Sequence, residues 1–172
     1  MLVGKCYTAV QEAMVALHAL VATVPNGHAR LDTLFNPCYT MENELDESVF
    51  ESTIMGYFQG ITQYNTLRPD AMTVSQVCEM FTSGKHPLDT LAAFVAKNRE
   101  GNCTDSKFDG AVNSTIEALR KEEFDGVSSS RQWVYQTCNE FGYFQNAASP
   151  HSPFFPLKTV SIENMAYIIC ER

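Results

Sequence analysis

The chain has 172 residues, of which 45% are hydrophobic, so it is long enough to bury a core and has the usual size of one domain. Its 20 acidic residues outnumber its 12 basic ones and are scattered along the chain, and the formal charge of -8 argues against nucleic acid as a partner. No stretch approaches the roughly 20 consecutive apolar residues of a membrane span, and residues 1–5 lack a signal-peptide pattern, so we expect no membrane insertion and either a trimmed mature start or an internal fragment.

Apolar residues recur at helical spacing through the first half of the chain. The first run predicts a helix over residues 6–24 that stops at the Pro-Asn-Gly sequence of residues 25–27. A short helix is expected over residues 29–35 and a longer amphipathic one over residues 45–61. The longer helix begins with acidic residues that suit the positive end of a helix dipole: Glu42, Glu44, Asp46 and Glu47.

The rest of the chain continues this helical spacing. Further helices are predicted over residues 74–84, 88–95, 112–124 and 161–170. Residues 133–144 are dense in aromatic side chains but have no clean helical period. With no repeat and no second apolar pattern, the chain is predicted to be mainly α, as one disulfide-linked helical bundle over residues 1–172.

Six cysteines lie far apart, without a Cys-x-x-Cys pair or a histidine spacing that suits zinc, so we predict three disulfides and no metal site or cofactor. Spacing alone leaves open all 15 ways of pairing six cysteines. Two sequons, at Asn102 and Asn113, would be glycosylation acceptors in the secretory pathway. Cysteines and sequons together favour an oxidising compartment.

Motifs for catalysis are missing from the chain. No serine has the Gly-x-Ser-x-Gly setting of a hydrolase nucleophile, and no phosphate loop or dinucleotide fingerprint is present. The four histidines are separated and none pairs with an acid in a recognisable motif, so they are interpreted as surface or helix-face residues. The acidic runs at residues 42–47 and 122–125 are interpreted as solvated helix ends. We therefore assign no catalytic residue.

One segment carries a longer motif: residues 131–145 read RQWVYQTCNEFGYFQ. It closely resembles the Arg-x-Trp-x-Tyr-Gln-x-Cys-x-Glu motif of the serine peptidase family of lysosomal Pro-X carboxypeptidase, dipeptidyl-peptidase II and thymus-specific serine protease. The order of the cysteines also resembles the helical cap of that family, which is inserted between the two halves of an α/β-hydrolase domain. The resemblance covers essentially the whole chain but is strong only over residues 131–145. Residues 145–147 depart from the pattern, because family members carry a further cysteine in that neighbourhood.

The resemblance implies that the pairs are Cys6 with Cys78, Cys38 with Cys103, and Cys138 with Cys170. It also implies that the catalytic serine precedes the cap and that the aspartate and histidine follow it, so the flanking catalytic segments lie outside this chain. The chain alone should then not hydrolyse peptides.

In the family, the cap roofs the active site and restricts entry to peptide ends or short peptides, often with a pocket that favours proline. The expected partners are the missing catalytic domain and a peptide substrate, with a homodimer as an option of the parent enzyme, in a secreted or lysosomal location.

Six residues at the motif positions are candidates for the wall of the substrate pocket: Trp133, Tyr135, Glu140, Phe141, Tyr143 and Phe144. The aromatic rings would give a pyrrolidine ring flat apolar contact, and Glu140 would orient the substrate backbone or meet its amine. Core packing beside a disulfide is the alternative for Trp133 and Tyr143. Arg131 and Gln136 are expected to hydrogen-bond loops at the junction with the catalytic domain, beside an apolar docking patch.

Two other hypotheses remain open. One is a free-standing secreted binding module with the cap fold, which a polar surface around Tyr143 and Phe144 would favour. The other is a cytosolic helical adaptor with reduced cysteines, which paired cysteines would exclude.

Overall fold

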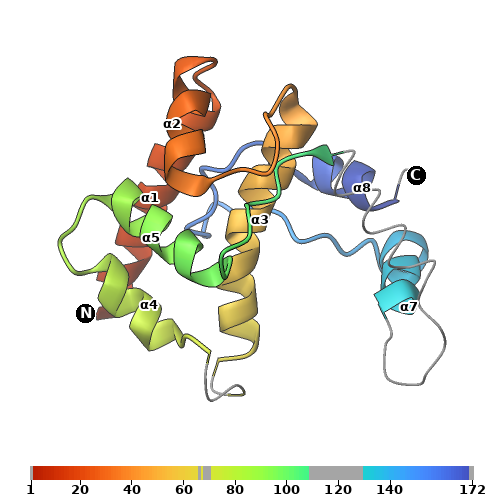
Figure 1. Cartoon of the computed structure of the whole chain (residues 1–172). Helices are drawn as coiled ribbons and strands as arrows, with labels where there is room; N and C mark the ends of the chain where they lie inside the picture. Colours follow the sequence, from red (N-terminus) through yellow and green to blue (C-terminus); the bar gives the residue numbers. More distant parts are fainter. Residues whose placement is uncertain (1, 66, 68–70, 109–129, 171–172) are drawn as a thin grey trace.

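The structure is a computed structural model that describes residues 2–65, 67, 71–108 and 130–170. The described residues contain no β-strand beyond an isolated bridge between Pro37 and Thr104, so the predicted mainly helical class is confirmed. In chain order the helices are α1 Leu2–Val21, α2 Asn26–Phe35, α3 Glu44–Gln63, α4 Val74–Phe81, α5 Pro87–Asn98, α7 Ser130–Gln136, the π-helix η1 Thr137–Phe141 and α8 Ile162–Cys170. Figure 1 shows α1, α2, α4 and α5 gathered on one side of the long α3, with α7 and α8 on the other.

The helix ends follow local chemistry. The side chain of Asn43 accepts hydrogen bonds from the backbone N–H groups of Leu45 and Asp46 and so caps α3. Thr73 and Gln76 form a reciprocal capping box at the start of α4, and a proline at the first position begins α5. The helices predicted over residues 6–24, 29–35, 45–61, 74–84, 88–95 and 161–170 are all present. The one predicted over residues 112–124 lies outside the described residues, as does Asn113.

The core lies where α1 meets α2, α3 and α5. Apolar side chains at the predicted spacing are fully buried there, and each contributes roughly 1.5–3 kcal/mol by leaving water. Those with no exposed surface include Met14, Leu17, Val21, Leu31, Phe35, Phe50, Ile54, Leu91 and Phe94.

A cluster of phenylalanines extends this core toward the C-terminal third of the chain. Phe58 of α3 lies 4.3 Å from Phe94, 5.7 Å from Phe81 and 5.3 Å from Phe154, measured between ring centroids. Edge and tilted ring contacts of this kind are favourable beyond the area they bury. The cluster therefore holds the segment around residue 154 against α3.

All six cysteines are paired, as the resemblance implied: Cys6–Cys78, Cys38–Cys103 and Cys138–Cys170. Their Cα separations of 5.1, 4.9 and 5.7 Å lie in the usual range for disulfides. They span 72, 65 and 32 residues, so each should contribute roughly 4 kcal/mol by restricting the unfolded chain. Because every cysteine is paired, the hypothesis of a helical adaptor with reduced cysteines is excluded.

Residues 133–144, whose spacing predicted no element, are helical in large part, because α7 continues into η1. A π-helix has more residues per turn than the 3.6 that the spacing test assumes. The expectation that the acidic run at residues 42–47 is solvated was wrong for Asp46, which is only 1% exposed. Its carboxylate accepts hydrogen bonds from the backbone N–H groups of Glu42 and Phe108, which ties the start of α3 to the chain after α5.

Candidate functional site

The six predicted pocket residues lie on α7, on η1 and on the segment that follows. Four of their aromatic side chains are between 51% and 61% exposed: Trp133, Tyr135, Phe141 and Tyr143. We call these four residues the aromatic rim. Glu140 is also exposed, whereas Phe144 is half-buried and packs against the main core. Trp133 and Tyr143 are therefore not core residues in the described part of the chain, so the alternative of core packing beside the disulfide does not hold for them.

The rim is positioned by η1 and its disulfide. Cys138 lies in η1 and bonds to Cys170 at the end of α8, while α8 in turn packs on α3. Gly142 ends η1 in the left-handed conformation, with φ of 60°, and its N–H donates to the carbonyl of Thr137. The chain therefore turns sharply between Phe141 and Tyr143.

This turn brings Tyr143 back to α7. Its ring lies 6.1 Å from the ring of Trp133 at an interplanar angle of 64°, an edge-to-face contact between two half-exposed side chains. The pair forms an exposed apolar surface between α7 and the turn after η1.

An open cleft of about 460 Å³ lies between α3 and the segment after η1. Tyr143 and Phe144 line it on one side. Much of the remaining lining consists of amide side chains: Gln59, Gln63, Gln145 and Asn146. The amide of Asn146 is already used within the chain, since it donates to the carbonyl of Phe144 and accepts from the N–H of Ala148. The glutamine amides can both donate and accept hydrogen bonds, as a peptide backbone requires. We call this space the amide cleft.

A second groove, of about 370 Å³, lies along α7. Tyr135 and Glu140 line it together with Arg131, Gln132 and Gln136. Tyr135 and the predicted Glu140 therefore share one groove, and Trp133 is not among its lining residues. Arg131 is exposed and Gln136 half-exposed, as expected for polar groups at a junction.

The structure thus divides four of the six predicted residues between two surfaces: Tyr143 and Phe144 line the amide cleft, and Tyr135 and Glu140 line the groove along α7. Trp133 and Phe141 line neither. The structure also adds the α3 residues Gln59 and Gln63, which sequence reasoning missed. The only signal for them was a polar stripe on an otherwise apolar helix, and such a stripe normally faces solvent.

Two histidines lie beside acids that are distant in the sequence, a relation that no local motif could show. Nε2 of His28 is 3.7 Å from a carboxylate oxygen of Glu47. Nδ1 of His18 in α1 lies 2.8 Å from a carboxylate oxygen of Glu51 in α3, and Glu51 has no exposed surface. The hydroxyl of Thr159 donates to the other oxygen of Glu51 at 2.5 Å. The hydrogen bond to Glu51 raises the pKa of His18 above its ordinary value, against the lowering effect of burial.

This pair lacks a nucleophile. Ser48 lies nearby, but its hydroxyl donates to the backbone carbonyl of Thr159 at 2.8 Å. A catalytic triad needs a serine hydroxyl bonded to the histidine, and the described part of the chain supplies none there. The His18–Glu51 pair joins α1 to α3 and is a structural contact.

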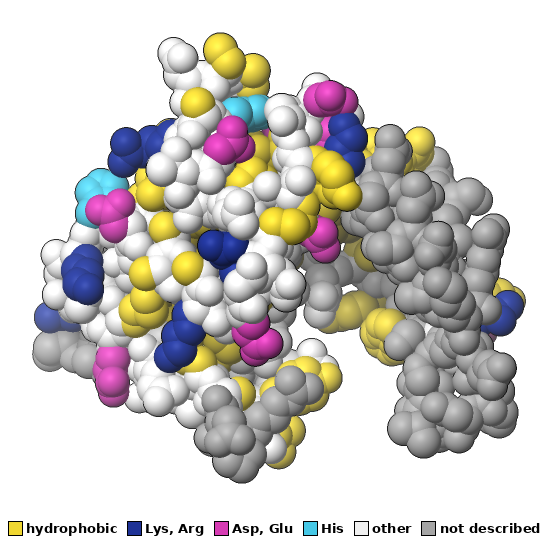
Figure 2. Space-filling model, in the orientation of Figure 1, with side chains coloured by type: hydrophobic (Ala, Val, Ile, Leu, Met, Phe, Trp, Pro, Cys, Tyr) yellow, Lys and Arg dark blue, Asp and Glu magenta, His cyan; other side chains and the backbone are white. Residues whose placement is uncertain are grey.

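Charge over the helical body is mixed, since Figure 2 shows acidic and basic side chains interspersed on the face it presents. Within the residues that the structure describes, no three histidine, cysteine, aspartate or glutamate side chains gather as a metal site would require. Among those residues, too, no helix is long and apolar enough to cross a membrane.

The chain is similar to known serine peptidases. The family model described as serine carboxypeptidase S28 matches residues 1–168. A Caenorhabditis elegans protein provisionally named a serine protease is 26% identical over 84% of the chain and 30% of its own length. Thymus-specific serine protease of Homo sapiens is 23% identical, over 89% of the chain and 31% of that protein. The Mus musculus protein of the same name is 21% identical, over 92% of the chain and 32% of its own length. The chain spans about a third of the length of these curated relatives, and no solved structure matches it significantly.

Proposed function

Because this chain belongs to the serine carboxypeptidase S28 family, we propose that it is the helical cap of a serine exopeptidase and forms part of the wall of its substrate pocket. The substrates would be short or proline-containing peptides. The nucleophile and its partners would come from the catalytic segments on either side, in an enzyme that is secreted or lysosomal.

The observation that carries the proposal is the aromatic rim beside the amide cleft. Folded proteins bury most of their large aromatic rings, so four half-exposed rings on one short segment indicate a surface that something else covers. The glutamine side chains of the cleft offer the directional hydrogen bonds that a peptide needs, and the rings offer apolar contact for a side chain or a pyrrolidine ring.

In this role the cap contributes shape and exclusion of water. Covering the active site limits which peptides reach the nucleophile and strengthens polar interactions inside the closed space. Glu140 is an acceptor for a peptide amine at the edge of the pocket, since it is exposed and lies beside Tyr135 and Arg131.

The first test separates the cap from the whole enzyme. The isolated chain and the full-length product of its gene are each treated with a fluorophosphonate that labels active serine hydrolases, and each is assayed on proline-containing peptides. We expect labelling and hydrolysis only with the full-length protein. Labelling or hydrolysis by this chain alone would overturn the proposal.

The second test concerns the pocket wall. In the full-length enzyme, Trp133→Ala and Tyr143→Ala should each raise KM about fivefold, because an aromatic contact contributes about 1 kcal/mol. Tyr39→Ala is the matched control, since Tyr39 is 58% exposed and lies outside α7 and η1. Unchanged KM values in both rim variants would remove these residues from the pocket.

A free-standing binding module is the second candidate. It is favoured by the mixed lining of the amide cleft, where polar amides lie next to Tyr143 and Phe144. A full-length gene product without serine hydrolase labelling, together with peptide binding by the chain alone, would support it over the cap.

A further inference from the structure

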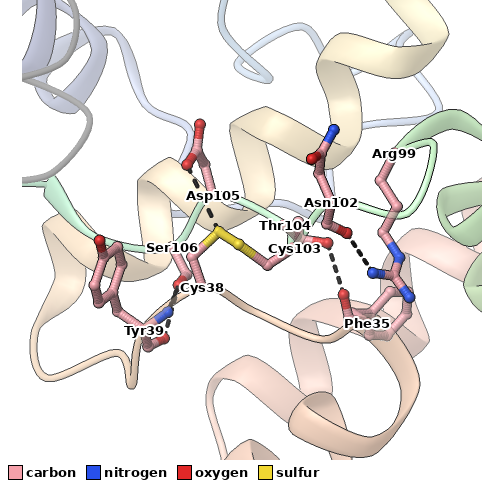
Figure 3. The surroundings of a disulfide bond; sticks show 9 residues. All are labelled: Phe35, Cys38, Tyr39, Arg99, Asn102, Cys103, Thr104, Asp105 and Ser106. Carbon is pink, nitrogen blue, oxygen red and sulfur yellow. Dashed lines mark hydrogen bonds between the residues drawn. A yellow bond between two sulfur atoms is a disulfide. The ribbon is translucent and has the colours of Figure 1, made fainter.

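The sequon at Asn102 lies in a short connection that the proposed function does not use. This connection follows α5 and runs beside the residues that join α2 to α3, where Cys38–Cys103 links the two segments. Figure 3 shows the whole sequon, Asn102-Cys103-Thr104, around this disulfide.

The acceptor side chain is well presented. Asn102 is exposed, and its backbone N–H donates to the carbonyl of Arg99 at 2.9 Å. The guanidinium of Arg99 donates to the backbone carbonyl of Asn102, so the turn is held through its main chain and leaves the side-chain amide outside. A glycan on Nδ2 of Asn102 would therefore displace no packed group of the folded chain.

The third sequon residue is the opposite case. Thr104 has no exposed surface, and its hydroxyl donates to the backbone carbonyl of Phe35 at 2.6 Å. Its N–H donates to the carbonyl of Asn36 at 2.9 Å, and its carbonyl accepts from the N–H of Cys38 at 2.8 Å. Main chain, side chain and the neighbouring disulfide all hold the tripeptide in place.

We propose that Asn102 is an N-glycosylation site that can be used only before Cys38–Cys103 closes. Transfer of the glycan requires a sequon whose threonine hydroxyl is free to meet the transferase, and in the folded connection this hydroxyl is buried and donates to the carbonyl of Phe35. Glycan addition and closure of this disulfide therefore compete in the newly made chain, and the order of the two events decides which form results.

The covalent step uses a lipid-linked oligosaccharide diphosphate as donor. A bond forms between Nδ2 of Asn102 and the anomeric carbon of the sugar, while the bond from that carbon to the diphosphate breaks. Nδ2 gives up one proton, and the lipid diphosphate leaves with the bonding electron pair. After transfer the disulfide can still close, because the modified amide points to solvent.

The test expresses the chain behind a secretion signal in a eukaryotic cell, with Asn113→Gln to silence the other sequon. Occupancy of Asn102 is read in whole-cell lysate from the mobility shift removed by a peptide N-glycosidase and from the Asn-to-Asp conversion in the matching peptide. Lysate is used because a variant retained through misfolding still reports.

We expect partial occupancy in this background, loss of the shift with Asn102→Gln, and near-complete occupancy with Cys38→Ser, which keeps the sequon but prevents closure. Cys6→Ser is the control, because it removes a different disulfide and should leave occupancy unchanged. The result that overturns the proposal is an unglycosylated Asn102 in the Cys38→Ser chain, or equal occupancy with and without Cys38. An equal rise with Cys6→Ser would also overturn it, because slow folding alone would then explain the effect. None of these outcomes depends on whether the chain is a peptidase cap.

Discussion

Replacing His18 with Gln tests the contact that joins α1 to α3. Glutamine keeps a neutral donor for Glu51 but cannot carry a charge. The pKa of His18 is raised in the folded chain, mainly by its hydrogen bond to Glu51, with the charges of Glu51 and Glu47 adding to the effect and Lys158 opposing it. The pKa of Glu47 is itself raised, chiefly by burial.

The sign of the pH effect follows from linkage. A group whose pKa is higher in the folded than in the unfolded chain adds stability that is fully present below the unfolded pKa, here the ordinary value of 6.5, and that is lost as the pH rises through the folded pKa. A charged hydrogen bond contributes about 1.5–3 kcal/mol and a neutral one about 0.5–1.5 kcal/mol, so exchanging one for the other should cost about 1.5 kcal/mol. For a chain of this length, that corresponds to a fall in Tm of about 3–6 °C.

The assay is thermal unfolding of the oxidised chain at pH 5 and pH 8, with the transition monitored by far-UV circular dichroism. His18→Gln should lower Tm by the full amount at pH 5 and by much less at pH 8. His151→Gln is the control, because His151 is exposed and should leave both values unchanged. A loss that is equal at the two pH values, or larger at pH 8, would refute the assignment of a charged His18–Glu51 contact.

Two further predictions concern the backbone and the third disulfide. Gly27→Ala should destabilise the chain by about 3 kcal/mol, because a Cβ there would lie 1.9 Å from a backbone oxygen of α1. Gly60→Ala in α3 has open space around the new Cβ and should stabilise the chain by up to about 1 kcal/mol. Chemical denaturation measures both free energies of unfolding, and similar values for the two variants would contradict the packing. Replacing Cys138 and Cys170 together by serine should leave the far-UV spectrum nearly unchanged. The unfolding midpoint measured by the fluorescence of the single tryptophan, Trp133, should fall below the midpoint measured by circular dichroism. Two transitions that still coincide would show that η1 does not depend on this bond.

Much of the helical body could be predicted from periodicity. Residues such as Leu17, Ile54 and Leu91 are apolar at the right spacing, and all three are fully buried. The pairing of the cysteines could not be predicted in this way, since spacing left 15 possibilities and only the resemblance chose among them. Pairing depends on which helices meet, and periodicity does not report that.

The features that sequence reasoning missed are long-range or irregular. His18 and Glu51 are 33 residues apart, so no local motif connects them, and Asp46 belongs to a run of acids of the kind that usually faces water. The π-helical turn at residues 137–141 hides its own periodicity. The candidate site was located by its motif, but the contribution of α3 to the amide cleft required the packing of residues 143–154 onto that helix.

The way the aromatic rim is held bears on its proposed role. Only Thr137 is buried within η1. Among the described residues, the elements that carry the rim connect to the body through Cys138–Cys170, the packing of α8 on α3, and the segment after η1, where Phe144 packs against the core. An element with so few buried side chains lies at the low end of local stability, and a covalent bond replaces the missing core. Rings presented by such an element can adjust to what covers them without disturbing the fully buried core of α1, α3 and α5. A rigid body with a covalently tethered aromatic edge would suit the proposed cap, which has to cover peptides of differing shape.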